Sequence, residues 1–188
     1  DSGNIEILGM TWYFNETNPL SGFTEWIDYA LQNNPNIKIF ISIPPIDFPA
    51  DWQQRAKDSG YNNIRDLYED VVSDLTHKAV IDQLRELYPS TEIFTLPTGW
   101  ATFDLVDQHE NNLLLDDVSL FGSYDDSIFT DAKGHQGEIV VNTGALIWLN
   151  GLYGVNLRTD NTDTGFNTDL HSIAENIMDL HDQNYKQQ

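Results

Sequence analysis

The amino-acid sequence predicts an α/β fold, a three-layer α/β/α sandwich around a mostly parallel sheet. Short runs rich in β-branched residues alternate with longer stretches in which apolar residues recur at helical spacing, and this alternation is typical of βαβ units. Hydrophobic residues make up 40% of the 188 positions, so the chain can bury a core despite its charge. We expect a single domain over residues 1–188, with its core in 5–157 and a polar loop and amphipathic helix in 158–188.

Three runs predict strands because β-branched and aromatic residues lie between residues that break regular structure. They cover residues 5–9, 37–43 and 92–96, and a proline follows each of the last two. Three strands are few for a sheet covered on both faces, where four to six are usual. We therefore expect either an opening βα unit outside this sequence or further strands within the irregular stretch 101–131.

Four stretches predict helices because their apolar residues repeat every three or four positions. They cover residues 23–31, 64–88, 139–153 and 170–180. The apolar stripes that we expect to face the core include Leu75 and Leu87 in the second stretch, Tyr153 in the third and Leu180 in the fourth, whereas His77 is expected to be solvated or partly buried. Right-handed crossover connections would place such helices on the faces of the sheet.

The net charge of the chain limits the classes of partner that we expect it to bind. Nine Lys and Arg against 30 Asp and Glu give a formal net charge of −21, which repels phosphate backbones and anionic headgroups and predicts neither a nucleic acid nor a membrane as partner. The absence of cysteine excludes disulfides, thiolate metal sites and a cysteine nucleophile. No signal-peptide pattern or long apolar run occurs, and the acid-rich composition favours a secreted or periplasmic protein while leaving a cytoplasmic one open.

One segment carries a candidate catalytic pair. Asp131 precedes His135 by four positions, with Gly134 and Gly137 beside the histidine, just before the predicted helix 139–153. A carboxylate close to an imidazole can accept the Nδ1 proton, fix the tautomer and leave Nε2 as a general base. The alternative is structural, in that Asp131 caps the helix and His135 is an ordinary polar residue in its first turn.

The same segment carries a family resemblance. The stretch 129–137, followed by 145–149 and 152–155, resembles the C-terminal catalytic block of the SGNH (GDSL-like) hydrolase superfamily, and residues 8–13 and 26–31 resemble the third block of that superfamily with its helix. The resemblance implies a flavodoxin-like sandwich of the SGNH-hydrolase type. It also implies a Ser-His-Asp triad in which His135 is the general base and Asp131 orients it.

The sequence departs from the superfamily pattern in three ways. The spacing between Asp131 and His135 is one residue longer than usual. The Gly-x-Asn of the third block, whose Asn donates to the oxyanion, reads Gly9-Met10-Thr11, which leaves Gly9, the hydroxyl of Thr11 and the nearby amide of Asn15 as candidate donors. The nucleophilic serine of the superfamily lies in a Gly-Asp-Ser-like turn after the first strand, and no strand precedes Ser2. We expect this serine on an upstream segment of the same protein; the alternative is a chain that never had it.

Together these observations predict an ester hydrolase, a carbohydrate deacetylase or acylesterase that needs neither a cofactor nor a metal and acts on a small-molecule or carbohydrate ester. Trp12, Tyr13 and Trp100 follow predicted strands, where aromatic rings can stack on sugars or simply cap the core. A non-catalytic SGNH-like domain that binds a glycan or protein partner through this aromatic rim is the first alternative. An acidic, salt-adapted surface protein is the second.

Overall fold

The computed structural model describes residues 5–11 and 19–188, which form a mixed α/β chain with small parallel sheets. Two compact units are present. The first contains the described residues up to Pro44 together with Glu69–Leu96 and Asp182–Gln188, and the second contains Pro45–Tyr68 and Pro97–His181. The single domain expected over residues 1–188 stays a prediction, and each unit is described by itself.

The first unit contains the three strands expected from the sequence. They are β1 (Ile7–Thr11), β2 (Lys38–Ser42) and β3 (Ile93–Leu96), which pair in parallel in the order β1-β2-β3. Gly9 of β1 lies opposite Phe40 of β2, and a Cβ atom at Gly9 would lie only 2.2 Å from the ring of Phe40. Glycine at this position therefore lets the large ring of β2 lie across the neighbouring strand.

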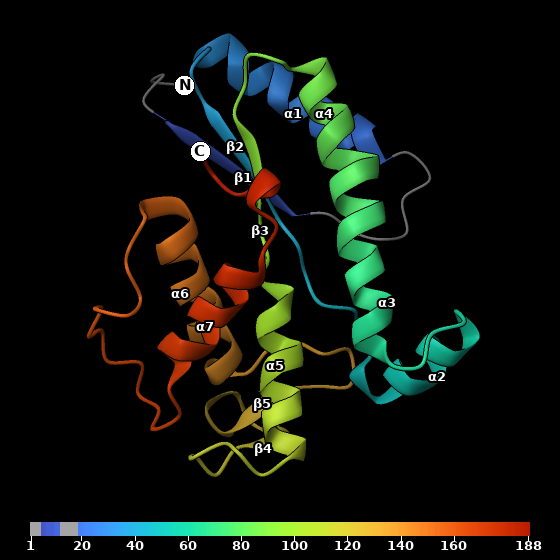
Figure 1. The fold of residues 1–188 in the computed structure, drawn as a ribbon, viewed down its shortest axis with the longest axis vertical. Helices are drawn as coiled ribbons and strands as arrows, with labels where there is room; N and C mark the ends of the chain where they lie inside the picture. The colour runs from blue at the N-terminus through green and yellow to red at the C-terminus, as the bar shows by residue number, and fades with distance from the viewer. Residues whose placement is uncertain (1–4, 12–18) are drawn as a thin grey trace. The chain divides into compact units, whose positions relative to one another are not determined.

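Two helical segments connect these strands on one face of the sheet (Figure 1). One is α1 (Pro19–Asn33), and the other is a π-helix, Val71–Asp82, that continues into α4 (Gln83–Leu87). The strand order follows the chain order, so two right-handed crossovers place both helices on the same face. The hydroxyl of Tyr88, just after α4, donates to the carboxylate of Asp28 in α1 at 2.8 Å. Within this unit the crossover helices do not produce the expected layer on each face.

The π-helix changes which side chains face the core. Its hydrogen bonds run from residue i to i+5, so the buried face advances more slowly than in an α-helix. Thr76 and His77 are buried in this segment, whereas Leu75 is 47% exposed and Leu87 in α4 is 58% exposed. The predictions that these two leucines face the core and that His77 is solvated or partly buried are therefore wrong, because they assumed one α-helical period throughout.

A C-terminal segment packs on this unit beside β3. Tyr185 lies in a short 3₁₀ turn, Gln183–Tyr185, and its ring stacks on that of His77 with the ring centroids 3.8 Å apart. The Nε2 atom of His77 lies 3.2 Å from the hydroxyl of Thr95 in β3. Burial, together with the neighbouring carboxylate of Asp82, raises the pKa of Tyr185 to about 12. The final residues are therefore part of the core of this unit.

The second unit is mainly helical. Its elements are α2 (Trp52–Asp58), α3 (Ile64–Asp70, which extends two residues beyond the unit), α5 (Gly99–Glu110), β4 (Ser119–Phe121), β5 (Ser127–Phe129), α6 (Glu138–Tyr153) and α7 (Leu170–Leu180). The two strands pair in parallel, which confirms that strands lie within the irregular stretch 101–131. Helices α6 and α7 pack side by side (Figure 1). Tyr153 and Leu180, at their ends, are 76% and 86% exposed, so the inward orientation predicted for both is wrong.

An aromatic cluster fills the core of the second unit. The ring of Trp52 stacks on Phe103 of α5 at 4.6 Å and meets the edge of Phe129 in β5 at 5.8 Å. The indole N–H of Trp52 donates to the carbonyl of Ile46 at 2.9 Å. A buried indole needs such a partner. The bond holds the chain before α2 to Trp52, and the ring of Trp52 in turn packs on the strand β5 that leads to the candidate site.

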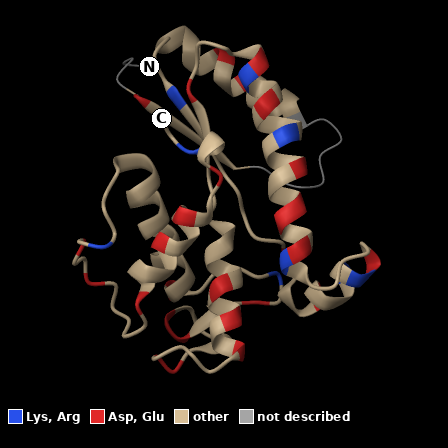
Figure 2. Ribbon diagram, viewed as in Figure 1, with Lys and Arg blue, Asp and Glu red and all other residues tan. Residues whose placement is uncertain are grey.

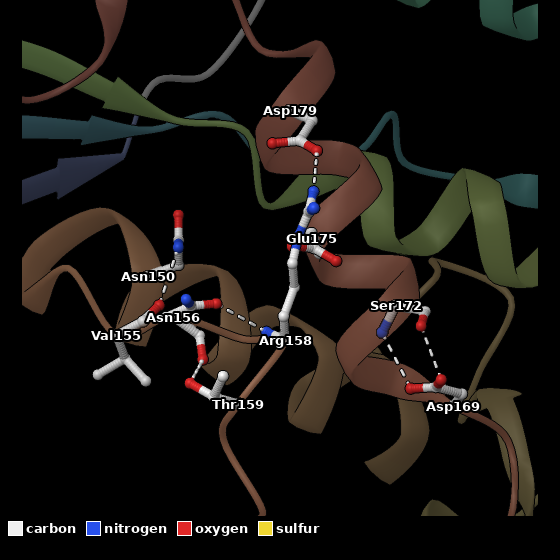
Figure 3. Close-up of polar contacts among 9 residues, drawn as sticks. All are labelled: Asn150, Val155, Asn156, Arg158, Thr159, Asp169, Ser172, Glu175 and Asp179. Carbon is white, nitrogen blue, oxygen red and sulfur yellow. Dashed lines mark hydrogen bonds and ion pairs between the residues drawn. The ribbon is translucent and has the colours of Figure 1, made fainter.

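Polar contacts attach the loop after α6 to α7. Arg158 binds Glu175 and, at 3.1 Å, Asp179, both on α7 (Figure 3). Asp169 caps α7 by accepting hydrogen bonds from the backbone N–H of Ser172 at 3.0 Å and from its hydroxyl at 2.6 Å. The predicted amphipathic helix is thus held to α6 by packing and to the preceding loop by ion pairs.

The surface of both units is acidic. Asp and Glu residues occur along the helices and loops of each unit, with few Lys and Arg residues between them (Figure 2). Within residues 5–11 and 19–188, none of the helices has the length and apolarity needed to span a membrane.

Candidate active site

The candidate catalytic residues lie in a tight turn between β5 and α6. The backbone N–H of Thr130 donates to the carbonyl of His135 at 2.8 Å, and the N–H of Gly137 donates to the carbonyl of Ile128 at 2.8 Å. An antiparallel bridge joins Phe129 to Gln136 between these two bonds. The chain therefore turns back on itself across residues 130–135, with both ends of the turn fixed to the buried strand β5.

Within this turn, Asp131 and His135 form a hydrogen-bonded pair. Oδ1 of Asp131 accepts hydrogen bonds from the backbone N–H groups of Gly134 at 3.0 Å and of His135 at 3.2 Å. Oδ2 of Asp131 contacts Nδ1 of His135 at hydrogen-bond distance. An ionised carboxylate can only accept, so Nδ1 carries the proton in this arrangement and Nε2 is left with a lone pair when the imidazole is neutral.

This arrangement keeps Asp131 ionised. The hydrogen bonds from the side chain and the backbone of His135, with a further one from Gly134, lower the pKa of Asp131 to about 2. A carboxylate with this pKa carries its negative charge at any pH above about 2. Asp131 can therefore stabilise an imidazolium on His135 throughout the neutral range, which is the role of the acid in a catalytic triad.

The helix-capping role that the structural alternative gives to Asp131 is wrong. Helix α6 begins at Glu138 with Gly137 as its N-cap residue, six residues after Asp131. The carboxylate of Asp131 is bonded to the turn, and the side chain of His135, 65% exposed, lies before the first turn of the helix. Both side chains are therefore exposed on a loop that follows a strand, where Asp131 also accepts the hydrogen bonds that hold the turn.

A second segment supports the turn from outside. The backbone N–H of Phe48 donates to the carbonyl of Lys133 at 2.8 Å, and the ring of Pro49 lies beside Gly134, where a Cβ atom would be 3.0 Å from Pro49 Cδ. Gly134 has φ +100°, a conformation that favours glycine. Phe48 itself has φ +59°, which costs a residue with a side chain about 1–2 kcal/mol. No sequence signal indicated Phe48, because it lies 85 positions before Lys133.

A substitution at Gly137 would test how closely the turn is packed. A Cβ atom there would lie 1.8 Å from the backbone carbonyl oxygen of Ser127, which cannot move without breaking β5. We expect Gly137→Ala to lower the free energy of unfolding by about 3 kcal/mol. Gly144→Ala is the matched control, because nothing lies within 4 Å of the added methyl group and alanine is favoured within a helix. Urea unfolding checks both variants, and equal stabilities would contradict the close packing.

The predicted oxyanion donors and two of the predicted aromatic residues lie in the first unit or outside the described residues. Gly9 and Thr11 lie in β1 of the first unit, and the hydroxyl of Thr11 donates to the carbonyl of Ser42 at 3.3 Å. Trp12, Tyr13 and Asn15 lie outside the described residues. Their roles, and the donation to an oxyanion expected of Gly9, Thr11 and Asn15, stay predictions.

Trp100 lies at the start of α5 in the second unit and is packed among other side chains. Its ring meets the edge of Tyr68 at 4.8 Å, and the guanidinium of Arg65 lies over it at 5.0 Å. Arg65 is itself held by Asp104 at 2.7 Å and Asp107 at 2.8 Å. A substrate that stacked on this ring would compete with Arg65, so a stacking role for Trp100 stays a prediction without structural support.

The turn contains one hydroxyl side chain, Thr130, which donates to the carbonyl of His135 at 3.2 Å rather than to the imidazole. Within residues 5–11 and 19–188, the hydrogen-bond partners of His135 are Asp131 and Thr130, and its Nε2 faces no serine hydroxyl at hydrogen-bond distance. The same residues contain no cluster of three or more histidine, aspartate or glutamate side chains that could hold a metal ion. No family model, no curated protein and no solved structure matches the chain.

Proposed function

We propose that this protein is a serine ester hydrolase of the SGNH type, a carbohydrate deacetylase or acylesterase. The observation that carries the proposal is the pair in which Asp131 holds Nδ1 of His135 while the imidazole is exposed to solvent. The mixed α/β fold with small parallel sheets is compatible with an α/β sandwich. A residue pair of this geometry is what a serine nucleophile requires for activation.

In the proposed reaction, Nε2 of His135 takes the proton of a serine hydroxyl as the serine oxygen attacks the ester carbonyl. The tetrahedral intermediate then expels the alcohol, which receives that proton from Nε2 and leaves an acyl-serine. Water attacks the acyl-serine in the same way and releases the carboxylic acid, which restores the serine. Asp131, ionised above a pH of about 2, stabilises the imidazolium that forms in each half of the cycle.

The serine and the oxyanion donors complete the proposal. Following the resemblance, in which the serine belongs to a block before the ones matched here, we place the serine on an upstream segment of the same protein. Gly9, Thr11 and Asn15 are the proposed oxyanion donors, following the resemblance of their block. A neutral ester suits the net charge of −21, because an anionic substrate would be repelled by the acidic surface.

Labelling with a fluorophosphonate tests the proposed function, because this reagent reacts with a serine that a neighbouring base activates. The full-length protein, expressed from its complete coding sequence, is labelled and mapped by peptide mass spectrometry. We expect one serine adduct, on a residue upstream of this sequence, that is absent in His135→Ala.

Other outcomes of the labelling are equally informative. An adduct on a serine within the 188 residues would refute the upstream origin but retain the hydrolase. No adduct on the folded full-length protein would refute the hydrolase and favour the alternative, a domain that binds a glycan or protein without turnover.

A further inference from the structure

The chain immediately before α2 presents one aromatic ring beside the catalytic turn. Phe48 is 42% exposed, whereas Ile46 and Trp52 on either side of it are only 4% and 6% exposed. The indole of Trp52 is bonded to the carbonyl of Ile46, and its ring packs on Phe129 at the end of β5. Buried residues thus anchor this segment on both sides of an exposed phenylalanine.

The backbone of Phe48 is attached to the turn that carries the pair. Its N–H donates to the carbonyl of Lys133 at 2.8 Å, and Lys133 lies midway between Asp131 and His135 in the sequence. Pro49, the next residue, lies against Gly134. The backbone of Phe48, whose side chain is partly exposed, is therefore held against the turn from which His135 projects.

The conformation of Phe48 gives no structural reason for a large apolar residue. Its φ of +59° and ψ of +66° lie in the left-handed region, which glycine or asparagine adopts at lower cost. The residue is 42% exposed, so a large part of its apolar surface stays in water, where it gives no hydrophobic stabilisation. Strained residues of this kind cluster where a protein contacts its ligands.

The chemistry of His135 indicates which part of a substrate would lie there. In ester hydrolysis the protonated histidine delivers its proton to the oxygen of the leaving alcohol, so this alcohol lies next to the imidazole. A side chain beside the histidine turn therefore meets the alcohol rather than the acyl group. In a carbohydrate ester the alcohol is the sugar, whose C–H face stacks on aromatic rings.

We propose that Phe48 is a specificity-determining residue whose ring stacks on the sugar that forms the alcohol part of the ester. This inference rests on the proposed function. It assigns to Phe48 the stacking role that the sequence suggested for Trp100, whose ring lies under Arg65. The acyl group lies away from this ring and is not selected by it.

The test compares two acetate esters that differ only in the alcohol, an acetylated methyl β-xyloside and methyl acetate, using the full-length protein. We expect Phe48→Ala to raise the KM for the xyloside about tenfold with kcat changed less than twofold, and to leave kcat/KM for methyl acetate unchanged. Phe48→Trp should restore a KM near that of the wild type. Trp148→Ala is the matched control, because Trp148 is also 42% exposed but lies about 15 Å along α6.

Two results would overturn the assignment. Equal losses of kcat/KM on both esters would show that Phe48 only positions the catalytic turn. An unchanged KM for the xyloside would show that the ring does not contact the sugar.

A binding experiment distinguishes a failure of this inference from a failure of the proposed function. If the wild-type protein hydrolyses neither ester, the hydrolase fails, but methyl β-xyloside can still be titrated against the ¹⁵N-labelled protein. We expect shifts of the amide signals of Phe48 and Lys133, and their loss in Phe48→Ala. Absence of these shifts in the wild-type protein would overturn the stacking role whatever the activity.

Discussion

Replacing His135 by alanine is expected to lower kcat/KM for ester hydrolysis by about 10⁴-fold or more. In the proposed reaction the imidazole of His135 accepts the proton of the serine, and its removal would leave the serine hydroxyl without a proton acceptor. The side chain is 65% exposed, so its loss should not unfold the protein. Steady-state kinetics on an acetylated sugar, with circular dichroism to confirm folding, checks this expectation.

The second unit supplies a matched control for this variant. His171 of α7 also pairs with an aspartate, since its Nε2 lies 3.0 Å from Asp160, but both side chains are only 18% exposed. His171→Ala should lower stability and leave the rate of hydrolysis within about twofold. Near-normal turnover by His135→Ala, or an equal loss in both variants, would refute the assignment of His135 as the base.

Replacing Asp131 by asparagine is the second large effect that we expect, a loss of about 10³- to 10⁴-fold in kcat. The amide oxygen of asparagine can still accept the N–H groups of Gly134 and His135, so the turn should keep its shape. The amide cannot stabilise an imidazolium as an ionised carboxylate does. Rates measured between pH 5 and 9 test this, because Asp131 with a pKa of about 2 stays ionised over that range and adds no titration step of its own.

Asp160→Asn is the corresponding control, since it changes the aspartate of the other pair. It should leave kcat unchanged within about twofold, because Asp160 is bonded to His171 and to the hydroxyl of Thr162. An Asp131→Asn variant that keeps more than a tenth of the wild-type kcat would show that the carboxylate is structural only.

The strands and helices that the sequence predicted correctly share one property, which is that local residues determine them. β2 and β3 are rich in β-branched and aromatic residues and end within two residues of a proline. Helix α6 ends at Tyr153, just before Gly154 with φ +65°. The π-helix could not be predicted in this way, because its period depends on packing in the first unit. β4 and β5 have three residues each, too few for an alternating pattern to show.

The residues of the candidate site differ in the same way, since some are close in sequence and others meet only in the folded chain. Asp131 and His135 lie four positions apart, so a single turn can bring them together and the pattern alone could indicate the pair. Phe48 contacts the turn through a backbone hydrogen bond to Lys133. Because any residue type can make a backbone hydrogen bond, the sequence does not indicate this contact. The close packing of Gly137 on Ser127 is likewise a property of the folded turn, although a glycine before a helix is compatible with it.

The tautomer of His135, read from ¹⁵N NMR at a pH where the imidazole is neutral, tests its pairing with Asp131 directly. Its signals are assigned by their loss in His135→Gln. The pairing with Asp131 predicts the proton on Nδ1 and a lone pair on Nε2, the form that can accept a proton from a serine. A proton on Nε2, or the averaged signals of a freely exchanging histidine, would contradict the account of this site.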